Sequence, residues 1–203
     1  LQYHEVKVNL EFESYANCKT SAVSTASASL SGVSLWVDYI YLDTDERRRF
    51  AQVSHEYLIE QLQFTGDEAG KTNASLRLNF NHPVKELVWV GTTANAGEYD
   101  GNLSNAKLQL NGHDRFAERN GDYFNKVQPY QHHTNIPSGN VYVYSFSLKP
   151  EEHQPSGTCN FSRIDNATLQ QTWSSAPTKI KVFAVNYNVL RVMSGMGGLA
   201  YSN

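Results

Sequence analysis

The chain of 203 residues is 40% hydrophobic, which is enough for one domain with a substantial core. Its 17 basic and 20 acidic residues give a formal net charge of −3 at pH 7 and form no block of like charge longer than Arg47–Arg49, so direct contact with nucleic acid is not expected. No run approaches the ~18 apolar residues of a membrane span, and the first residues, LQYHEVKV, lack the pattern of a secretory signal.

Two expected strands flank a polar stretch in the first 42 residues. Apolar and polar residues alternate strictly over Glu5–Glu13, which predicts a half-buried strand. Ser14–Gly32 is rich in Ser, Ala and Thr and has no periodicity, so it is expected to be either an exposed functional loop or a mobile one. Val33–Leu42 is apolar on both faces, as in a strand that is covered on two sides.

The sequence contains one good helical candidate, Asp43–Gln52. Asp43 is placed to cap it, and Glu46 follows three residues later, as in a capping box. The side chains of Arg47–Arg49 would spread around this short helix, which favours a solvated face or partner contacts over a phosphate site.

Seven further predicted strands are separated by turn residues. The clearest are Ala74–Phe80 and Val141–Leu148, which each present an apolar stripe at a period of two. The other five are Glu56–Thr65, Glu86–Val90, Ala106–Asn111, Cys159–Thr172 and Ile180–Val192. This pattern predicts an all-β antiparallel sandwich with one short helix. Periodicity alone does not distinguish jelly-roll from immunoglobulin-like connectivity, and nine candidates exceed the eight strands of a jelly roll, so one must extend a sheet or be wrong.

The residue patterns argue against a reactive centre. Cys18 and Cys159 lie far apart and are expected to be free thiols, as in a protein assembled in reducing cytosol. His132 and His133 are neighbours on the chain and would face opposite ways on an extended segment, so we expect no metal site and no cofactor. Ser162 and Asp165 have no Gly-x-Ser-x-Gly turn around them, so no hydrolytic enzyme is expected.

Long stretches of the chain resemble one protein family. The most specific are Gln154–Leu169 (QPSGTCNFSRIDNATL) and Val185–Asn203 (VNYNVLRVMSGMGGLAYSN). The resemblance continues through Leu1–Val8, Leu35–Gln52, His55–Gly66, Leu76–Val84 and Leu108–Gln131. These stretches resemble the major capsid proteins of the chlorella viruses. The chlorella viruses are large icosahedral double-stranded DNA viruses, and their capsomers are built from paired jelly rolls. The segments unlike the family are polar or turn-rich and are expected to be surface loops: Ala16–Ser31, Thr92–Asn105, His132–Asn140 and Thr172–Lys179.

The resemblance implies an eight-stranded jelly roll over residues 1–203 as a single domain. In this family a first jelly roll precedes the second, and Leu1 is not the Met of a translation start. The chain is therefore expected to be the second half of a longer polypeptide. The implied function is that of a structural protein in a homotrimeric, pseudo-hexagonal capsomer. The implied partners are neighbouring capsomers, minor capsid proteins and the upstream jelly roll, and the implied location is the virion shell, after assembly in the host cytoplasm.

Two sets of surface residues follow from these interpretations. The aromatic and charged stretch Asp114–Tyr130 is the candidate contact between domains or subunits. Its named members are Arg115, Phe116, Tyr123, Phe124 and Tyr130. Asn135 resembles a glycan acceptor of the family, and Asn73 and Asn102 lie in Asn-x-Ser sequences outside the predicted strands. Asn160 begins an Asn-x-Ser sequence and Asn166 an Asn-x-Thr sequence, but we discount both because they fall within a predicted strand.

A carbohydrate-binding module is the alternative from another functional class, because jelly rolls also form lectins. Trp89, Tyr99 and Trp173 would then supply the aromatic surface for a sugar. A lectin binds sugars as an independent domain, whereas one half of a capsid subunit is expected to expose an apolar flank.

Overall fold

The computed structural model describes residues 3–12, 15, 29–92 and 99–202. The chain divides into two compact units. The first contains Leu1–Tyr57 and Leu190–Leu199, and the second contains Leu58–Val189 and Ala200–Asn203. The predicted loops Ser14–Gly32 and Thr92–Asn105 lie partly outside the described residues, and Cys18 lies wholly outside them.

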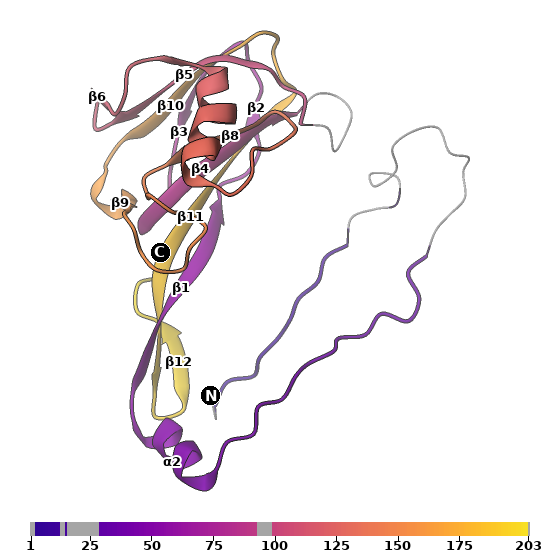
Figure 1. Cartoon of the computed structure of the whole chain (residues 1–203), viewed down its shortest axis with the longest axis vertical. Coiled ribbons are helices and arrows are strands. Elements are labelled where there is room, and N and C mark those ends of the chain that lie inside the picture. The colour runs from indigo at the N-terminus through magenta and orange to yellow at the C-terminus, as the bar shows by residue number, and fades with distance from the viewer. Residues whose placement is uncertain (1–2, 13–14, 16–28, 93–98, 203) are drawn as a thin grey trace. The chain divides into compact units, whose positions relative to one another are not determined.

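Two antiparallel sheets make up the sandwich (Figure 1). The first sheet has the order β1 (His55–Phe64), β11 (Lys179–Met193), β4 (Pro83–Thr92), β8 (Val141–Ser145). The short strands β2 (Glu68–Ala69) and β12 (Met196–Leu199) pair with β11, and β9 (Cys159–Asn160) pairs with β4. The second sheet has the order β3 (Asn73–Arg77), β10 (Ala167–Trp173), β5 (Leu103–Leu110), β6 (His113–Asp114), with β7 (Arg119–Asn120) also on β5. This order is consistent with the predicted jelly roll.

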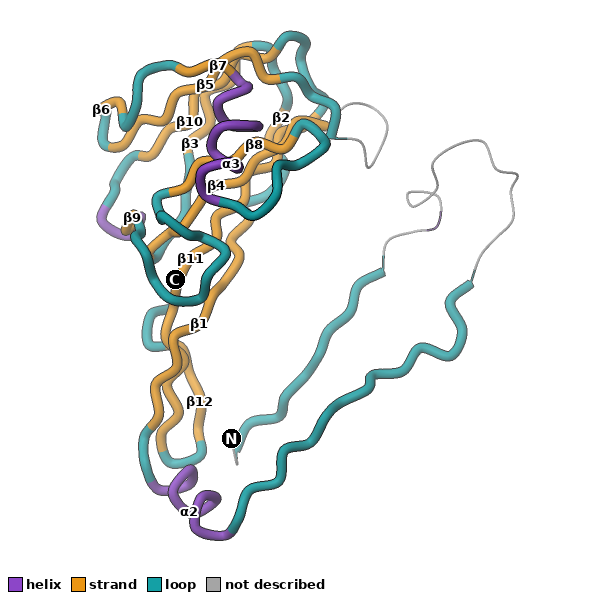
Figure 2. Tube along the Cα trace, viewed as in Figure 1, coloured by secondary structure: helices purple, strands orange, loops and turns teal. Residues whose placement is uncertain are grey.

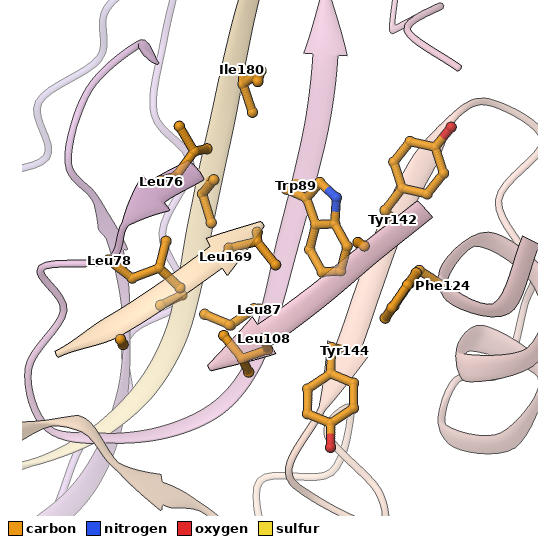
Figure 3. Close-up of a cluster of buried hydrophobic side chains, with 14 of the residues drawn as sticks. Leu76, Leu78, Leu87, Trp89, Leu108, Phe124, Tyr142, Tyr144, Leu169 and Ile180 are labelled. Carbon is orange, nitrogen blue, oxygen red and sulfur yellow. The ribbon is translucent and has the colours of Figure 1, made fainter. Parts of the chain in front are cut away.

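The core lies between the inner faces of the two sheets (Figure 3). Leu76, Leu108 and Leu169 point inward from the second sheet and meet Leu87 and Trp89 of the first. Strand β10 shows the underlying period of two, because its buried residues alternate with half-buried ones along the whole strand. Trp173 and Tyr142 extend this core, with ring centroids 5.8 Å apart in an edge-on arrangement.

The predicted helix is confirmed as α2 (Thr44–Gln52). Asp43 lies at its N-cap, where the Oδ1 atom accepts a hydrogen bond of 2.8 Å from the Glu46 backbone N–H. A second helical segment was not predicted. It consists of the π-helical turn η1 (Tyr123–Val127) and α3 (Gln128–His132), which both lie against β8. In addition, a 3₁₀ turn, η2 (Phe161–Arg163), interrupts the single strand predicted over Cys159–Thr172.

Two of the nine predicted strands are wrong. The described parts of Glu5–Glu13 and the whole of Val33–Leu42 form loops (Figure 2). Their apolar side chains are exposed, and Trp36 retains 91% of its accessible surface. A strand needs a hydrogen-bonded neighbour, and no described strand pairs with either segment. The remaining seven predictions correspond to β1, β3, β4, β5, β8, β10 with β9, and β11.

The buried position of Leu87 provides a test of the core. Leu87→Ala should lower the free energy of unfolding by about 2–5 kcal/mol, because it leaves a cavity between the sheets. Leu148→Ala is the matched control, since its side chain is 71% exposed, and it should change stability by less than ~0.5 kcal/mol. Urea unfolding followed by circular dichroism measures both values, and equal losses would contradict this description of the core.

Candidate assembly surfaces

The outer face of the first sheet carries an apolar strip beside its edge strand. Phe64 of β1 stacks on Phe183 of β11, with ring centroids 4.7 Å apart. Leu62 lies two residues before Phe64, on the same face of the strand, and keeps 65% of its surface exposed. We call Leu62, Phe64 and Phe183 the apolar strip. The inner positions of β11 are Ile180, Val182 and Ala184, so Phe183 points away from the core.

In the second half of β1 the polar glutamine side chains lie on the inner side of the strand and the apolar side chains lie on the outer side, which is the reverse of the usual arrangement. Gln63 and Gln61 lie on the half-buried side, where their amides hydrogen-bond the side chains of Asn186 and Asn188, each in β11, at 2.9 Å and 3.0 Å. Gln61 and Gln63 are therefore hydrogen-bonded on the inner side, while the apolar residues Leu62 and Phe64 face outward. The sequence YLIEQLQF contains this period, but it does not say which side faces the core.

A buried lysine of the first sheet binds the loop after β8 through a hydrogen bond. The ammonium of Lys85, which is fully buried, donates to Glu60 Oε1 at 2.7 Å and to the Glu152 carbonyl at 2.9 Å, and it lies 4.9 Å from the ring centroid of Tyr187. Burial lowers the pKa of Lys85, but the contacts with Glu60 and Tyr187 outweigh it, so the pKa lies above its usual value. Tyr187 also donates its hydroxyl to the His153 carbonyl at 3.0 Å.

His133 makes a second set of polar contacts, which connect the segment after α3 to the first sheet. Its Nε2 lies 3.0 Å from Glu86 Oε2, and its Nδ1 lies 3.2 Å from Glu151 Oε1. Glu151 also accepts a hydrogen bond of 3.0 Å from the Thr134 backbone N–H. The Glu86 carboxylate raises the pKa of His133 most; burial opposes this and Glu151 adds to it, so the pKa lies above its usual value.

The predicted contact residues divide into buried and exposed members. Phe124 is fully buried and packs against Trp89 at 5.2 Å between ring centroids, and Phe116 packs against the same core. Phe124 therefore has no surface left for a partner. Arg115 and Tyr130 are exposed and Tyr123 is half-buried, so a contact role for these three stays a prediction.

The three predicted glycan acceptors are exposed. Asn135 follows α3, Asn73 begins β3, and Asn102 precedes β5. The Asn135 amide lies at 3.5 Å from its neighbour Thr134 Oγ1. Their modification stays a prediction.

The residues considered for other functions have structural roles. Trp89 and Trp173 are buried in the core, so they cannot form the sugar-binding surface of a lectin, and Tyr99 is the only exposed member of that set. Ser162 Oγ accepts a hydrogen bond of 2.8 Å from the His82 backbone N–H.

Neither a metal site nor a membrane-spanning helix is found in the described parts of the chain. Among residues 3–12, 15, 29–92 and 99–202, no three His, Cys, Asp or Glu residues are grouped as metal ligands. No helix among these residues is long and apolar enough to cross a membrane. Cys159 is a free thiol whose pKa is raised by burial.

The chain matches two family models that meet near α2. Residues 46–198 match the major capsid protein of large eukaryotic DNA viruses, and residues 1–43 match the major capsid protein N-terminus. These matches agree with the predicted family, and that family consists of capsid structural proteins rather than enzymes.

Relatives of known identity are considerably longer than this chain. The chain is 59% identical to the major capsid protein of Pyramimonas orientalis virus and 45% identical to that of Paramecium bursaria Chlorella virus 1. Each alignment covers 100% of the chain, but only 56% and 62% of the respective relative. Among solved structures, the quasi-atomic model of the PBCV-1 virus capsid superposes with a TM-score of 0.75 at 44% identity, covering 81% of this chain and 56% of the other.

The contacts of His133 predict a pH-dependent contribution to stability. Because its folded pKa is raised, its stabilising effect is complete below its unfolded pKa of ~6.5 and is lost as the pH rises through the folded value. His133→Gln should cost about 1–2 kcal/mol at pH 6 and clearly less at pH 9, as measured by urea unfolding. His113→Gln, at an exposed position, should show no such difference between the two pH values. A cost at His133 that does not change with pH would contradict the charge-based explanation.

Proposed function

Because this chain belongs to the family of major capsid proteins of large eukaryotic DNA viruses, we propose that it supplies a jelly roll to the subunit of an icosahedral capsid. The work of such a protein is mechanical, since a stiff sandwich presents fixed faces to its neighbours. The observation that carries this proposal is the apolar strip of Leu62, Phe64 and Phe183 on the outer face of a sheet. Neighbouring exposed apolar side chains of this kind support a contact with another protein.

We propose further that another jelly roll of the same polypeptide lies beside this one in the subunit. The described parts of residues 3–12 and 29–43 are unpaired loops with exposed apolar side chains, and residues 1–43 match the N-terminal family model. Both facts support a role for this segment as part of the preceding domain, where neighbouring strands would cover it. The greater length of the relatives also supports this division, with the second jelly roll formed by the strands from β1 onward.

Three such subunits would form one capsomer. Two similar jelly rolls in each of three subunits give six similar domains around one axis, which yields a nearly hexagonal block. The apolar strip is our candidate for the contact between subunits, and Arg115, Tyr123 and Tyr130 remain candidates for a contact between domains or subunits. Loop asparagines such as Asn135 would carry any glycans. Assembly would take place in the host cytoplasm.

The apolar strip offers a direct test in the native polypeptide that contains this chain. Leu62→Glu should weaken association of the subunits by roughly 10- to 100-fold, because it buries a charge in the contact. Thr168→Glu places the same charge on the outer face of the opposite sheet and is the matched control. Mass photometry over a concentration series measures the fraction of three-copy particles in each variant.

Two outcomes would contradict the proposal. If the unmodified native polypeptide forms only single copies at all concentrations, and electron micrographs show no hexagonal blocks, the trimeric capsomer is wrong. If Thr168→Glu disrupts the trimers and Leu62→Glu does not, the contact lies on the second sheet rather than on the apolar strip.

A further inference from the structure

The outer face of the second sheet is polar at every position of its three long strands. The register aligns these positions in three rows that cross the strands: Arg77–Thr168–Gln109, Ser75–Gln170–Lys107 and Asn73–Thr172–Asn105. All nine side chains come from alternate positions that face away from the core. This face therefore contrasts with the apolar strip on the first sheet, and it presents hydrogen-bonding groups where the other presents hydrocarbon.

A groove of about 270 Å³ lies over two of these rows. Its lining includes the six side chains of the Ser75 and Asn73 rows, together with Glu118 from the segment before β7. The Arg77 row does not line it. The volume is close to the lower limit of small-molecule sites, ~300 Å³, and so suits a ligand of one small ring.

The groove is nearly neutral and rich in unused hydrogen-bonding capacity. Among the described residues, Lys107 is the one cation in its lining, and its ammonium lies 3.4 Å from Asp114 Oδ1. Gln170 is held in place because its Nε2 donates to Gln109 Oε1 at 2.9 Å, which leaves its carbonyl oxygen as an acceptor. Within the described residues, the side chains of Asn73, Ser75 and Asn105 have no hydrogen-bond partner.

We propose that this groove binds a single neutral sugar residue. Each amide offers both a donor and an acceptor, and each sugar hydroxyl also does both, so adjacent hydroxyls of a pyranose match the adjacent amides of the rows. Anionic ligands are disfavoured, since the lining cation Lys107 is already paired and Glu118 adds a carboxylate. Among the described residues, the lining offers an apolar ligand only the methyl group of Thr172, because the side chain of Ala74 lies in the core.

The composition of the lining also indicates how tightly the groove would bind a sugar. Sugar sites that bind tightly use an aromatic ring as a platform, and the described lining of the groove contains no aromatic ring. Binding should therefore be weak, with a Kd of ~1–10 mM. The proposal goes beyond the structural role in a capsid, and it does not depend on whether three subunits associate through the apolar strip.

Titration of the full chain with simple sugars tests the site. The probes are the methyl glycosides of glucose, galactose and mannose, and N-acetylglucosamine, and ligand-observed NMR measures their Kd values. At least one should bind, and Gln170→Ala and Asn105→Ala should each raise its Kd by roughly fivefold through the loss of a hydrogen bond. Thr168→Ala is the matched control from the row outside the groove, and its Kd should equal that of the unmodified chain. Asn73→Ala, at the exposed start of β3, serves as a further groove variant if either of the others fails to fold.

Four results would overturn the proposal. No saturation by any probe below ~50 mM would show that the groove is only a solvated sheet face. An equal loss of binding in Thr168→Ala would place the sugar elsewhere on the sheet. Tighter binding of glucuronate or glucose 6-phosphate than of glucose would identify an anion site. A change in the sedimentation coefficient of Gln170→Ala, without loss of sugar binding, would mark the groove as a protein contact.

Discussion

The pairing of β11 with β4 in the centre of the first sheet is the constraint on which the rest of the structure depends. These two strands pair from Lys179 opposite Thr92 to Asn186 opposite Val84, and their inner positions are almost completely buried. The register fixes Ile180, Val182 and Ala184 against the second sheet. By the period of two, it also fixes what faces outward, including Phe183 of the apolar strip. A shift of one residue would exchange the core for the surface.

The two outer faces of the sandwich are free to differ because the core needs only the inner ones. On the first sheet the outer face is apolar beside β1 and is crossed by loops that Lys85 and His133 hold in place. On the second sheet the outer face consists of amides, hydroxyls and a few charges. One scaffold thus presents a surface suited to another protein and a surface suited to water or a hydroxylated ligand, without a change in its packing.

The elements that could be predicted from the sequence are those whose signal is local. The cap at Asp43 and the single apolar stripe of Ala74–Phe80 depend on residues a few positions apart, and both were confirmed. The strand predicted over Val33–Leu42 was wrong because a strand forms only when a neighbouring strand hydrogen-bonds to it, and the hydrophobicity of a segment does not show whether such a neighbour exists. The segment Tyr123–His132 was missed because Pro129 and its aromatic neighbours do not form a regular helical stripe.

The candidate surfaces were harder to predict, because they depend on how strands far apart in sequence align. Phe124 has the composition of a contact residue, yet it closes the core next to Trp89. Leu62 and Phe64 look like core residues in sequence, but the register of β1 places Gln61 and Gln63 on the inner side and therefore turns Leu62 and Phe64 outward. The groove is equally non-local, since its rows take one residue each from β3, β5 and β10.

Because β11 lies late in the sequence but pairs with two early strands, the first sheet can form only after β11 has been synthesised. Its neighbours in the sheet are β1 and β4, which begin at His55 and Pro83, whereas β11 itself begins at Lys179. Pairings over such distances in sequence form slowly, because a long loop must be ordered first. During translation, β1 and β4 leave the ribosome long before their common neighbour is made, with their hydrogen-bonding edges open to wrong partners. These edges therefore stay exposed to incorrect pairing until the last long strand has emerged.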